Sequence, residues 1–311
     1  MIGSRLWLAW HRFRHLWLSL SYLAYFAFAW VPMTTLPAAA QPNLWECPSS
    51  VTASEDSEAM PRLVSTPVAE FPVEGGDLRV FAAASLTDAF QEIESELEAA
   101  TPNLSITYNF GGSQALVTQL KEGAEADILA SANTAQMDVA TEAGLIAGDA
   151  TTFVRNHLAI VTPADNSANI ESAADLGKEG ILLVLAQPEV PAGRYAREAI
   201  CLMASDTATY GSDFVQRVAA NVVSEEEDVR DVLAKVSLGE ADAGVVYVSD
   251  AVAAGDQVLV VDIPDEVDVM ATYPVALLAG GDEALGSAFV FYLLSEEGQA
   301  LLERYGFQPV K

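Results

Sequence analysis

The segment from Val80 to Phe90 joins a short apolar strand to a helix through a run of small residues. The run from Leu78 to Phe81 predicts a buried strand, and apolar residues at helical spacing from Leu86 to Leu97 predict a helix. Ser85 stands where an N-cap would, and Asp88 completes a capping-box pattern. The same N–H groups, helix dipole and hydroxyl would also suit a bound anion. The stretch therefore predicts a strand that is followed directly by a helix, with the first turn of that helix exposed at the end of the strand.

Strands and helices alternate from Leu78 onward, which predicts an α/β fold with mainly parallel sheets. The later strands are expected at 104–110, 126–132, 157–162, 181–185, 241–248, 258–261 and 273–278. The helices are expected at 86–99, 134–143, 194–203 and 283–304, with further helices after Ser113 and after Asp228. The pattern of a helix, an Ala-Asp pair and a strand occurs twice, at Asp127 and at Asp242. Such a repeat is expected in a protein that is built of two similar α/β lobes.

Hydrogen-bond donors recur where the expected strands end. Gly111-Gly112-Ser113 repeats the arrangement at Ser85, and each of these serines can equally be read as a turn or helix cap. Two prolines precede the helix start near Ala192, the acids before Val229 complement another helix start, and one strand ends at Tyr247. In an open α/β sheet such loops follow the strand ends where ligands bind.

The chain is strongly acidic. Its formal net charge is −29, and beyond residue 40 there are 12 Lys and Arg against 44 Asp and Glu, or −32. Such a surface repels nucleic acid and anionic lipid. The simplest interpretation is that the charge keeps the protein soluble.

The first 40 residues have the pattern of an export signal. A basic region ends at Arg14, an apolar run extends from Leu16 to Val31, and Pro37-Ala38-Ala39-Ala40 offers a cleavage site before Gln41. We therefore expect a signal peptide at 1–40 and a periplasmic or extracellular location. The alternative is an uncleaved N-terminal anchor, although the apolar run is short for a membrane span. A lipoprotein box ending at Cys47 is disfavoured because Trp45 and Glu46 are too large and polar.

Residues 41–76 are rich in Ser, Pro, Glu and Thr, which predicts a flexible acidic tether. Export would remove the chain from cytosolic reductants, so its two cysteines matter. Cys47 lies in the tether and Cys201 lies late in an expected helix. A disulfide that joins Cys47 to Cys201 is a hypothesis.

Catalytic and cofactor motifs are missing from the sequence. His157 is the only histidine beyond the export signal, and Ser113 does not lie in a G-x-S-x-G elbow. There is no P-loop, no G-x-G-x-x-G and no Cys/His cluster for zinc. We therefore expect no enzyme activity, no cofactor and no metal site. The donors at helix starts fit a different task, because each hydrogen bond to a charged group contributes roughly 1.5–3 kcal/mol, and around six could offset the burial of an oxyanion.

Seven segments in this order, between Leu78 and Val310, resemble the periplasmic molybdate-binding proteins of ABC transporters. The segments are Val80 to Thr87, Phe110 to Ser113, Val190 to Ala196, Glu227 to Arg230, Val245 to Tyr247, Tyr273 to Ala276 and Arg304 to Phe307. The resemblance implies an α/β, two-lobed type II periplasmic binding protein fold with a ligand cleft between the lobes. It also places the oxyanion, molybdate or tungstate, on the two serines, two backbone amides and a tyrosine hydroxyl, here Ser85, Ser113, Ala192, Val229 and Tyr247.

The resemblance further implies an ABC permease with a cytoplasmic ATPase as the partner, and we expect a monomer that binds no nucleic acid. Lobe 1 would comprise 77–155 and 272–311, and lobe 2 would comprise 156–271, with hinges near His157 and Tyr273. Gly111-Gly112 departs from the serine-rich approach of some members. The alternatives are a binding protein for sulfate or another oxyanion, a membrane-anchored oxyanion sensor, and a hydrolase that uses Ser85.

Overall fold

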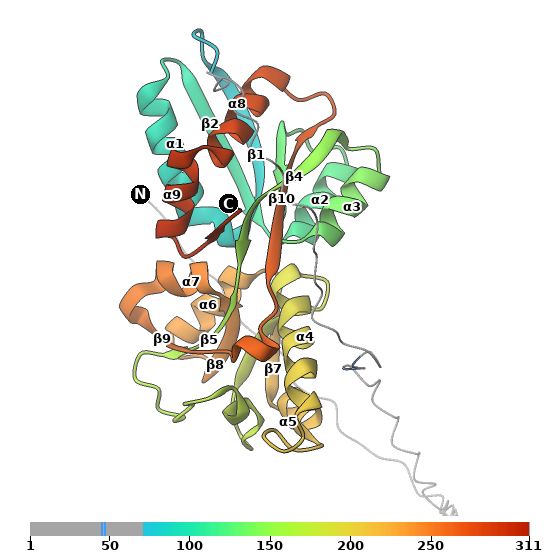
Figure 1. Cartoon of the computed structure of the whole chain (residues 1–311), viewed down its shortest axis with the longest axis vertical. Coiled ribbons are helices and arrows are strands. Elements are labelled where there is room, and N and C mark those ends of the chain that lie inside the picture. Colours follow the sequence, from blue (N-terminus) through green and yellow to red (C-terminus); the bar gives the residue numbers. More distant parts are fainter. Residues whose placement is uncertain (1–44, 46, 48–70, 311) are drawn as a thin grey trace, which may run out of the picture. The chain divides into compact units, whose positions relative to one another are not determined.

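The structure is a computed structural model, which describes residues 45, 47 and 71–310. The expected signal peptide and most of the tether lie outside the described residues. Two mixed sheets form the framework, each flanked by helices (Figure 1). The two-lobed α/β arrangement expected from the sequence is confirmed, but the sheets are not mainly parallel.

The first sheet has the strand order β11-β4-β10-β3-β1-β2. Its strands are β1 (Gly76–Ala83), β2 (Leu104–Gly111), β3 (Ile128–Ala130), β4 (Ile146–Asn156), β10 (Ala271–Leu278) and β11 (Gln308–Pro309). β1 pairs in parallel with β2 and β3, whereas β10 is antiparallel to β3 and β4. The return of the chain through β10 therefore makes this sheet mixed.

Side chains alternate between the faces of β1 and meet a different group of helices on each. One face packs on α1 (Thr87–Ala100), α8 (Glu283–Leu294) and α9 (Glu296–Arg304), through residues such as Val80 and Phe90. The other face packs on α2 (Ser113–Lys121) and α3 (Thr134–Glu142), through Phe81 and Leu116. The first sheet is thus covered on both sides.

The second sheet has the order β7-β6-β8-β5-β9 and is also mixed. Its strands are β5 (Leu158–Pro163), β6 (Leu183–Ala186), β7 (Val222–Glu226), β8 (Ala243–Tyr247) and β9 (Val258–Val261). Its helices are α4 (Pro191–Ser205), α5 (Phe214–Asn221), α6 (Val229–Ser237) and α7 (Val248–Ala254). Figure 1 shows α4 and α5 on one side of this sheet and α6 and α7 on the other.

The chain passes from the first sheet to the second at His157, between β4 and β5, and returns between β9 and β10. The His157 ring pairs with Asp268 on the returning segment, so the two connections are joined to each other. This pairing uses the only described histidine, and it gives His157 a structural partner.

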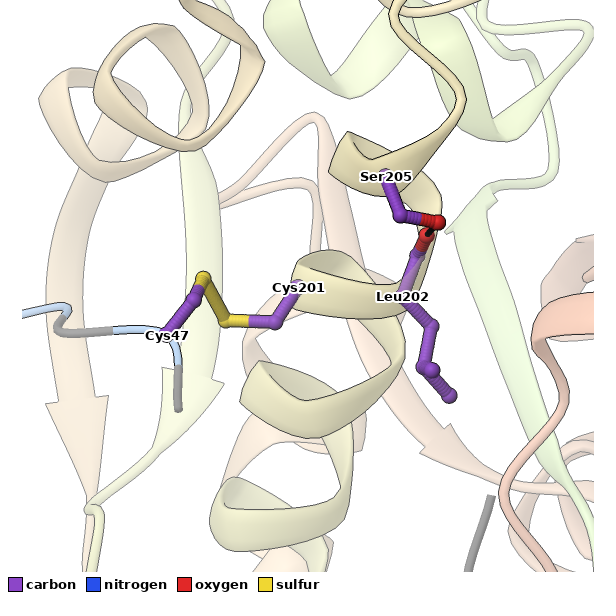
Figure 2. Close-up of a disulfide and its surroundings, with 4 residues drawn as sticks. All are labelled: Cys47, Cys201, Leu202 and Ser205. Carbon is purple, nitrogen blue, oxygen red and sulfur yellow. Dashed lines mark hydrogen bonds between the residues drawn. A yellow bond between two sulfur atoms is a disulfide. The ribbon is translucent and has the colours of Figure 1, made fainter. Parts of the chain in front are cut away.

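Cys47 and Cys201 form a disulfide, as the sequence hypothesis proposed, and Cys201 lies in α4 (Figure 2). Two residues before Cys47, the Trp45 ring lies 5.2 Å from the guanidinium carbon of Arg197, also on α4. One turn past the disulfide, the Ser205 hydroxyl donates to the Leu202 carbonyl at 2.6 Å, near the end of α4. The segment around Cys47 is therefore attached to the second sheet's longest helix. Among the described residues, no helix is long and apolar enough to cross a membrane.

One predicted helix has the wrong extent, and five elements were not predicted, namely β4, β7, β11, α5 and α7. The helix expected at 283–304 is broken at Ser295, whose side chain accepts from the Gly298 N–H and begins α9. Of the elements that were not predicted, β4 is an 11-residue strand with several exposed residues and no regular apolar alternation.

Candidate functional site

One small pocket is lined by all five residues that were expected to hold an oxyanion, namely Ser85, Ser113, Ala192, Val229 and Tyr247. Its described lining is Ala83, Ala84, Ser85, Gly111, Gly112, Ser113, Ala132, Val190, Pro191, Ala192, Asp228, Val229 and Tyr247. Strand ends and helix starts of both sheets contribute, so the pocket lies where the two halves of the fold meet. Its volume is about 10 Å³, near the smallest cavity that holds a water molecule. The residues of the lining therefore converge closely on one small space.

Ser85 lies in a 3-10 turn (Ala84–Leu86) between β1 and α1 and is 3% exposed. It does not cap α1, which begins at Thr87 without a side-chain cap, so the capping-box interpretation is wrong. The Ser85 Oγ lies 2.9 Å from the hydroxyl of Tyr273, a fully buried residue on β10. Ser85 therefore lines the pocket, and the buried Tyr273 hydroxyl supports it from behind.

Ser113 is the first residue of α2 and is 1% exposed. Its Oγ accepts the backbone N–H of Ala132 at 3.0 Å. A serine hydroxyl has a single proton, and accepting this bond leaves that proton available to donate. Ser113 is therefore fixed by the loop after β3 and can act as a donor in the pocket.

Ala192 lies in the first turn of α4, after Pro191. The N-cap residue, Val190, makes no side-chain capping bond. The first intrahelical bond near this end is from the Arg194 N–H to the Val190 carbonyl, at 2.9 Å. The preceding N–H groups of the turn have no helical acceptor, and they carry the positive end of the helix dipole. This helix start presents backbone donors to the pocket.

Val229 begins α6, and the N-cap Asp228 controls which donors are used there. The Asp228 carboxylate accepts the N–H groups of Arg230 at 2.8 Å and Asp231 at 3.1 Å. Because the side chain caps the second and third helical residues, the Val229 N–H is left for the pocket. The Asp228 Oδ1 therefore accepts bonds from the helix terminus itself.

Tyr247 ends β8 and is 1% exposed. Its hydroxyl oxygen has no hydrogen-bond partner among the described residues. An unsatisfied buried hydroxyl is destabilising by roughly 1–3 kcal/mol, which marks it as a group that a ligand would satisfy. Burial, followed by the neighbouring Tyr273, raises the pKa of Tyr247 well above its ordinary value, so the phenol keeps its proton. Tyr247 can thus donate to an anion.

The pocket offers neutral donors and no cation. Of the described residues that line it, Asp228 alone is charged. Neither serine contacts a histidine: Ser85 bonds to Tyr273, and His157 pairs with Asp268. Within the described part of the chain, no group of three His, Cys, Asp or Glu residues could hold a metal ion. The arrangement can bind a small oxyanion through hydroxyl and amide protons.

The chain is similar to known proteins over most of the region that the structure describes. Residues 78–308 match the family model of the bacterial extracellular solute-binding proteins. The chain belongs to this family. Its expected membership of a solute-binding family is thereby confirmed.

Individual relatives extend the match over most of the chain. The molybdate-binding protein ModA of Mycobacterium tuberculosis is 40% identical over 238 residues, covering 76% of this chain and 86% of that protein. The Escherichia coli ModA is 34% identical over 244 residues, covering 75% and 89%. Among solved structures, a substrate-binding domain from Clostridium difficile assigned to a molybdenum ABC transporter has 32% identity and a TM-score of 0.56, covering 76% and 99%.

Sequence reasoning missed two residues that hold the pocket together. Tyr273 and Arg230 belong to segments that carried the resemblance, but Tyr273 was expected only near a hinge and Arg230 was assigned no role. Tyr273 supports Ser85 across the sheet, and Arg230 forms the ion pairs described below. The Ser85–Tyr273 and Asp88–Arg230 contacts each join residues more than 100 positions apart, so no local pattern indicates them.

Proposed function

We propose that this protein captures molybdate, and tungstate as its near equal, outside the cytoplasm and delivers it to an ABC import permease with a cytoplasmic ATPase. The observation that carries the proposal is the convergence of Ser85, Ser113, Ala192, Val229 and Tyr247, all neutral groups, on one small pocket. The names of the M. tuberculosis and E. coli relatives support molybdate as the ligand.

The donors account for the expected ligand class. Molybdate, tungstate and sulfate are dianions that only accept hydrogen bonds, which matches hydroxyl and amide donors. Protonated phosphate has a hydroxyl that needs an acceptor, whereas the groups that converge on the pocket are donors, apart from the Asp228 carboxylate, whose Oδ1 caps α6. The site should therefore disfavour phosphate, while discrimination between molybdate and sulfate depends on size.

We propose that lobe 1 comprises 77–155 with 272–311, that lobe 2 comprises 156–271, and that the lobes close on the anion by hinge motion near His157 and Tyr273. The protein should act as a monomer after removal of residues 1–40.

The first test is a thermal melt of the protein purified after export, with millimolar molybdate, tungstate, sulfate or phosphate. A ligand at 1,000 times its Kd adds about 4 kcal/mol, which raises the Tm by several degrees. We expect this rise with molybdate and tungstate and little change with phosphate. A sulfate shift of equal size would favour a general oxyanion carrier, and no shift with any anion would contradict the proposal.

A second measurement tests the residues and the location. Replacing Ser85 and Ser113 together by alanine should abolish the molybdate shift, whereas alanine at the exposed Ser167 should leave it unchanged. N-terminal sequencing of the exported protein should begin at Gln41. A retained N-terminus would instead favour the membrane-anchored sensor.

A further inference from the structure

Arg230 follows Val229 directly, but its side chain turns away from the pocket lining and meets two carboxylates. The guanidinium pairs with Asp88 on α1, and its Nε lies 2.9 Å from the Oδ1 of Asp250 on α7. Asp250 is fully buried, whereas the Asp88 side chain is 40% exposed. α1 packs on the first sheet, and α6 and α7 pack on the second. Arg230 therefore joins the two halves of the fold beside the pocket.

The same residue is connected to three parts of the pocket. Asp88 lies one helical turn after Ser85, and Arg230 lies one residue after Val229. Asp250 also accepts the backbone N–H of Tyr247 at 3.1 Å. The distance from Asp88 to Arg230 thus depends on how closely Ser85 approaches Val229 and Tyr247.

We propose that the Asp88–Arg230 ion pair is a closure contact, which forms as the two lobes close on the anion and slows its release. Arg230 is a positioning residue and does not contact the ligand. This inference rests on the proposed function, because closure on a small oxyanion is what brings the pair together.

A second contact also joins the two halves of the fold. The Gln114 Nε2 donates to the Glu227 carbonyl at 3.0 Å, from α2 to the segment before α6. This bond is exposed, and both partners can find water when the lobes separate. Asp88–Arg230 differs because Arg230 is held on the other side by a fully buried carboxylate. The arginine is therefore preorganised to receive Asp88 on closure.

Two physical effects of Asp88 on anion binding have opposite signs. As a negative charge near the pocket, Asp88 should repel a dianion, so its removal would speed association and tighten binding. As a closure contact, its removal should speed release and weaken binding. The Asp88→Asn variant distinguishes these effects and leaves the Arg230–Asp250 pair in place.

The test measures release of ⁹⁹Mo-labelled molybdate from the exported protein after addition of excess unlabelled molybdate. We expect Asp88→Asn to raise the release rate by about threefold to tenfold, given a partly buried pair, and to leave the association rate within about twofold. Asp88→Glu, which keeps the charge, should restore slow release. Glu283→Gln, at an exposed first-turn acid of α8, controls for loss of a helix-dipole interaction and should resemble the wild type.

The outcomes separate this inference from the function on which it rests. If the wild type binds no labelled molybdate, the proposed function fails. If it binds and Asp88→Asn releases at the wild-type rate or more slowly, the closure contact is refuted and the function stands. Arg230→Lys gives an independent check, since a lysine keeps the charge but cannot meet two carboxylates in fork geometry, and release should again be faster.

Discussion

At the scale of single residues, the hydrogen bonds of the two pocket serines determine where each hydroxyl proton can point. Ser113 accepts the Ala132 N–H, which directs its own proton elsewhere. The Ser85–Tyr273 bond at 2.9 Å permits either direction. Burial raises the pKa of Tyr273 above its ordinary value, so its phenol remains a donor. If Tyr273 donates to Ser85, both serines can direct a proton at an anion.

Replacement of Tyr273 by phenylalanine tests this orientation. The variant removes the donor behind Ser85, and the loss of one hydrogen bond worth roughly 0.5–1.5 kcal/mol should weaken molybdate binding by about threefold to tenfold. Isothermal titration calorimetry gives the affinity. Tyr292→Phe is the control, because the Tyr292 hydroxyl bonds to the exposed Glu96 at 2.8 Å and does not line the pocket. Equal affinities for both variants would contradict the assigned direction.

Gly112 presents a second residue-scale constraint, because a Cβ there would lie 2.7 Å from the Glu227 carbonyl oxygen across the pocket. Its φ of −60° is compatible with alanine, so Gly112→Ala should fold normally. Closure should then be hindered, and molybdate affinity should fall tenfold or more, as overpacking of roughly 1–3 kcal/mol implies. Gly111→Ala is a matched control, since its Cβ would meet Leu116 at an ordinary 3.6 Å. Calorimetry showing equal affinities for both variants would mean that the approach of Glu227 is not needed.

The five ligand candidates could be named from sequence because each lies at a local boundary between a strand and a helix. A strand end followed by small residues, proline or an acidic cap is visible in the sequence around Ser85, Ala192 and Val229. The partners of these residues could not be named, because they depend on tertiary packing. The capping prediction failed at Ser85 for the same reason: its hydroxyl bonds to Tyr273, 188 residues away, in place of the local backbone.

At the scale of elements, most helices and strands with regular apolar patterns were predicted, but α5, α7 and the largely unburied edge strand β7 were not. α1, α4 and β8 bury regular sets of residues and were predicted. β4 was missed because its pairing with β10 includes register shifts and only three of its 11 residues are buried. The mixed direction of the sheets was also not predicted. It depends on the antiparallel pairing of β10 with β3 and of β5 with β8, and these partners are far apart in the sequence.

The start of α7 predicts a pH dependence of stability. Burial raises the pKa of Asp250 from its ordinary 3.8 to about 6, although Arg230 acts in the opposite direction. The folded state therefore binds this proton more tightly than the unfolded state. The stabilising contribution is fully present below about pH 3.8 and is lost as the pH rises through about 6.

Asp250→Asn isolates this effect, because asparagine does not titrate. Between pH 4 and pH 7 the variant's free energy of unfolding should increase by about 2 kcal/mol relative to that of the wild type, so the variant gains relative stability as the pH rises. Urea denaturation of both proteins at several pH values gives the difference between their free energies of unfolding. The contributions of other acids cancel in this difference. Two curves that remain parallel across this range would show that Asp250 is not the titrating group.

At the scale of the whole molecule, the disulfide attaches the segment that precedes the first sheet to a helix of the second. Cys47 and Cys201 are 154 positions apart, and the first sheet's β1 begins between them, at Gly76. The bond is also close to the pocket through Arg197, which lies one turn before Cys201. Its Nη1 donates to the carbonyls of Ala186 and Gly193, both at 2.7 Å, on either side of the loop that leads to Ala192.

Replacing both cysteines by serine should therefore lower stability and leave ligand affinity nearly unchanged. A closed loop of this length restricts the unfolded chain strongly, and its loss should reduce the free energy of unfolding by roughly 2–5 kcal/mol. The pocket should persist, because Arg197 keeps its bonds to both carbonyls and to Glu225 without the disulfide. Thermal melts and calorimetry with molybdate separate the two effects. If affinity fell together with stability, the attached segment would be part of the binding machinery, since Trp45 would then be needed to hold Arg197 in place.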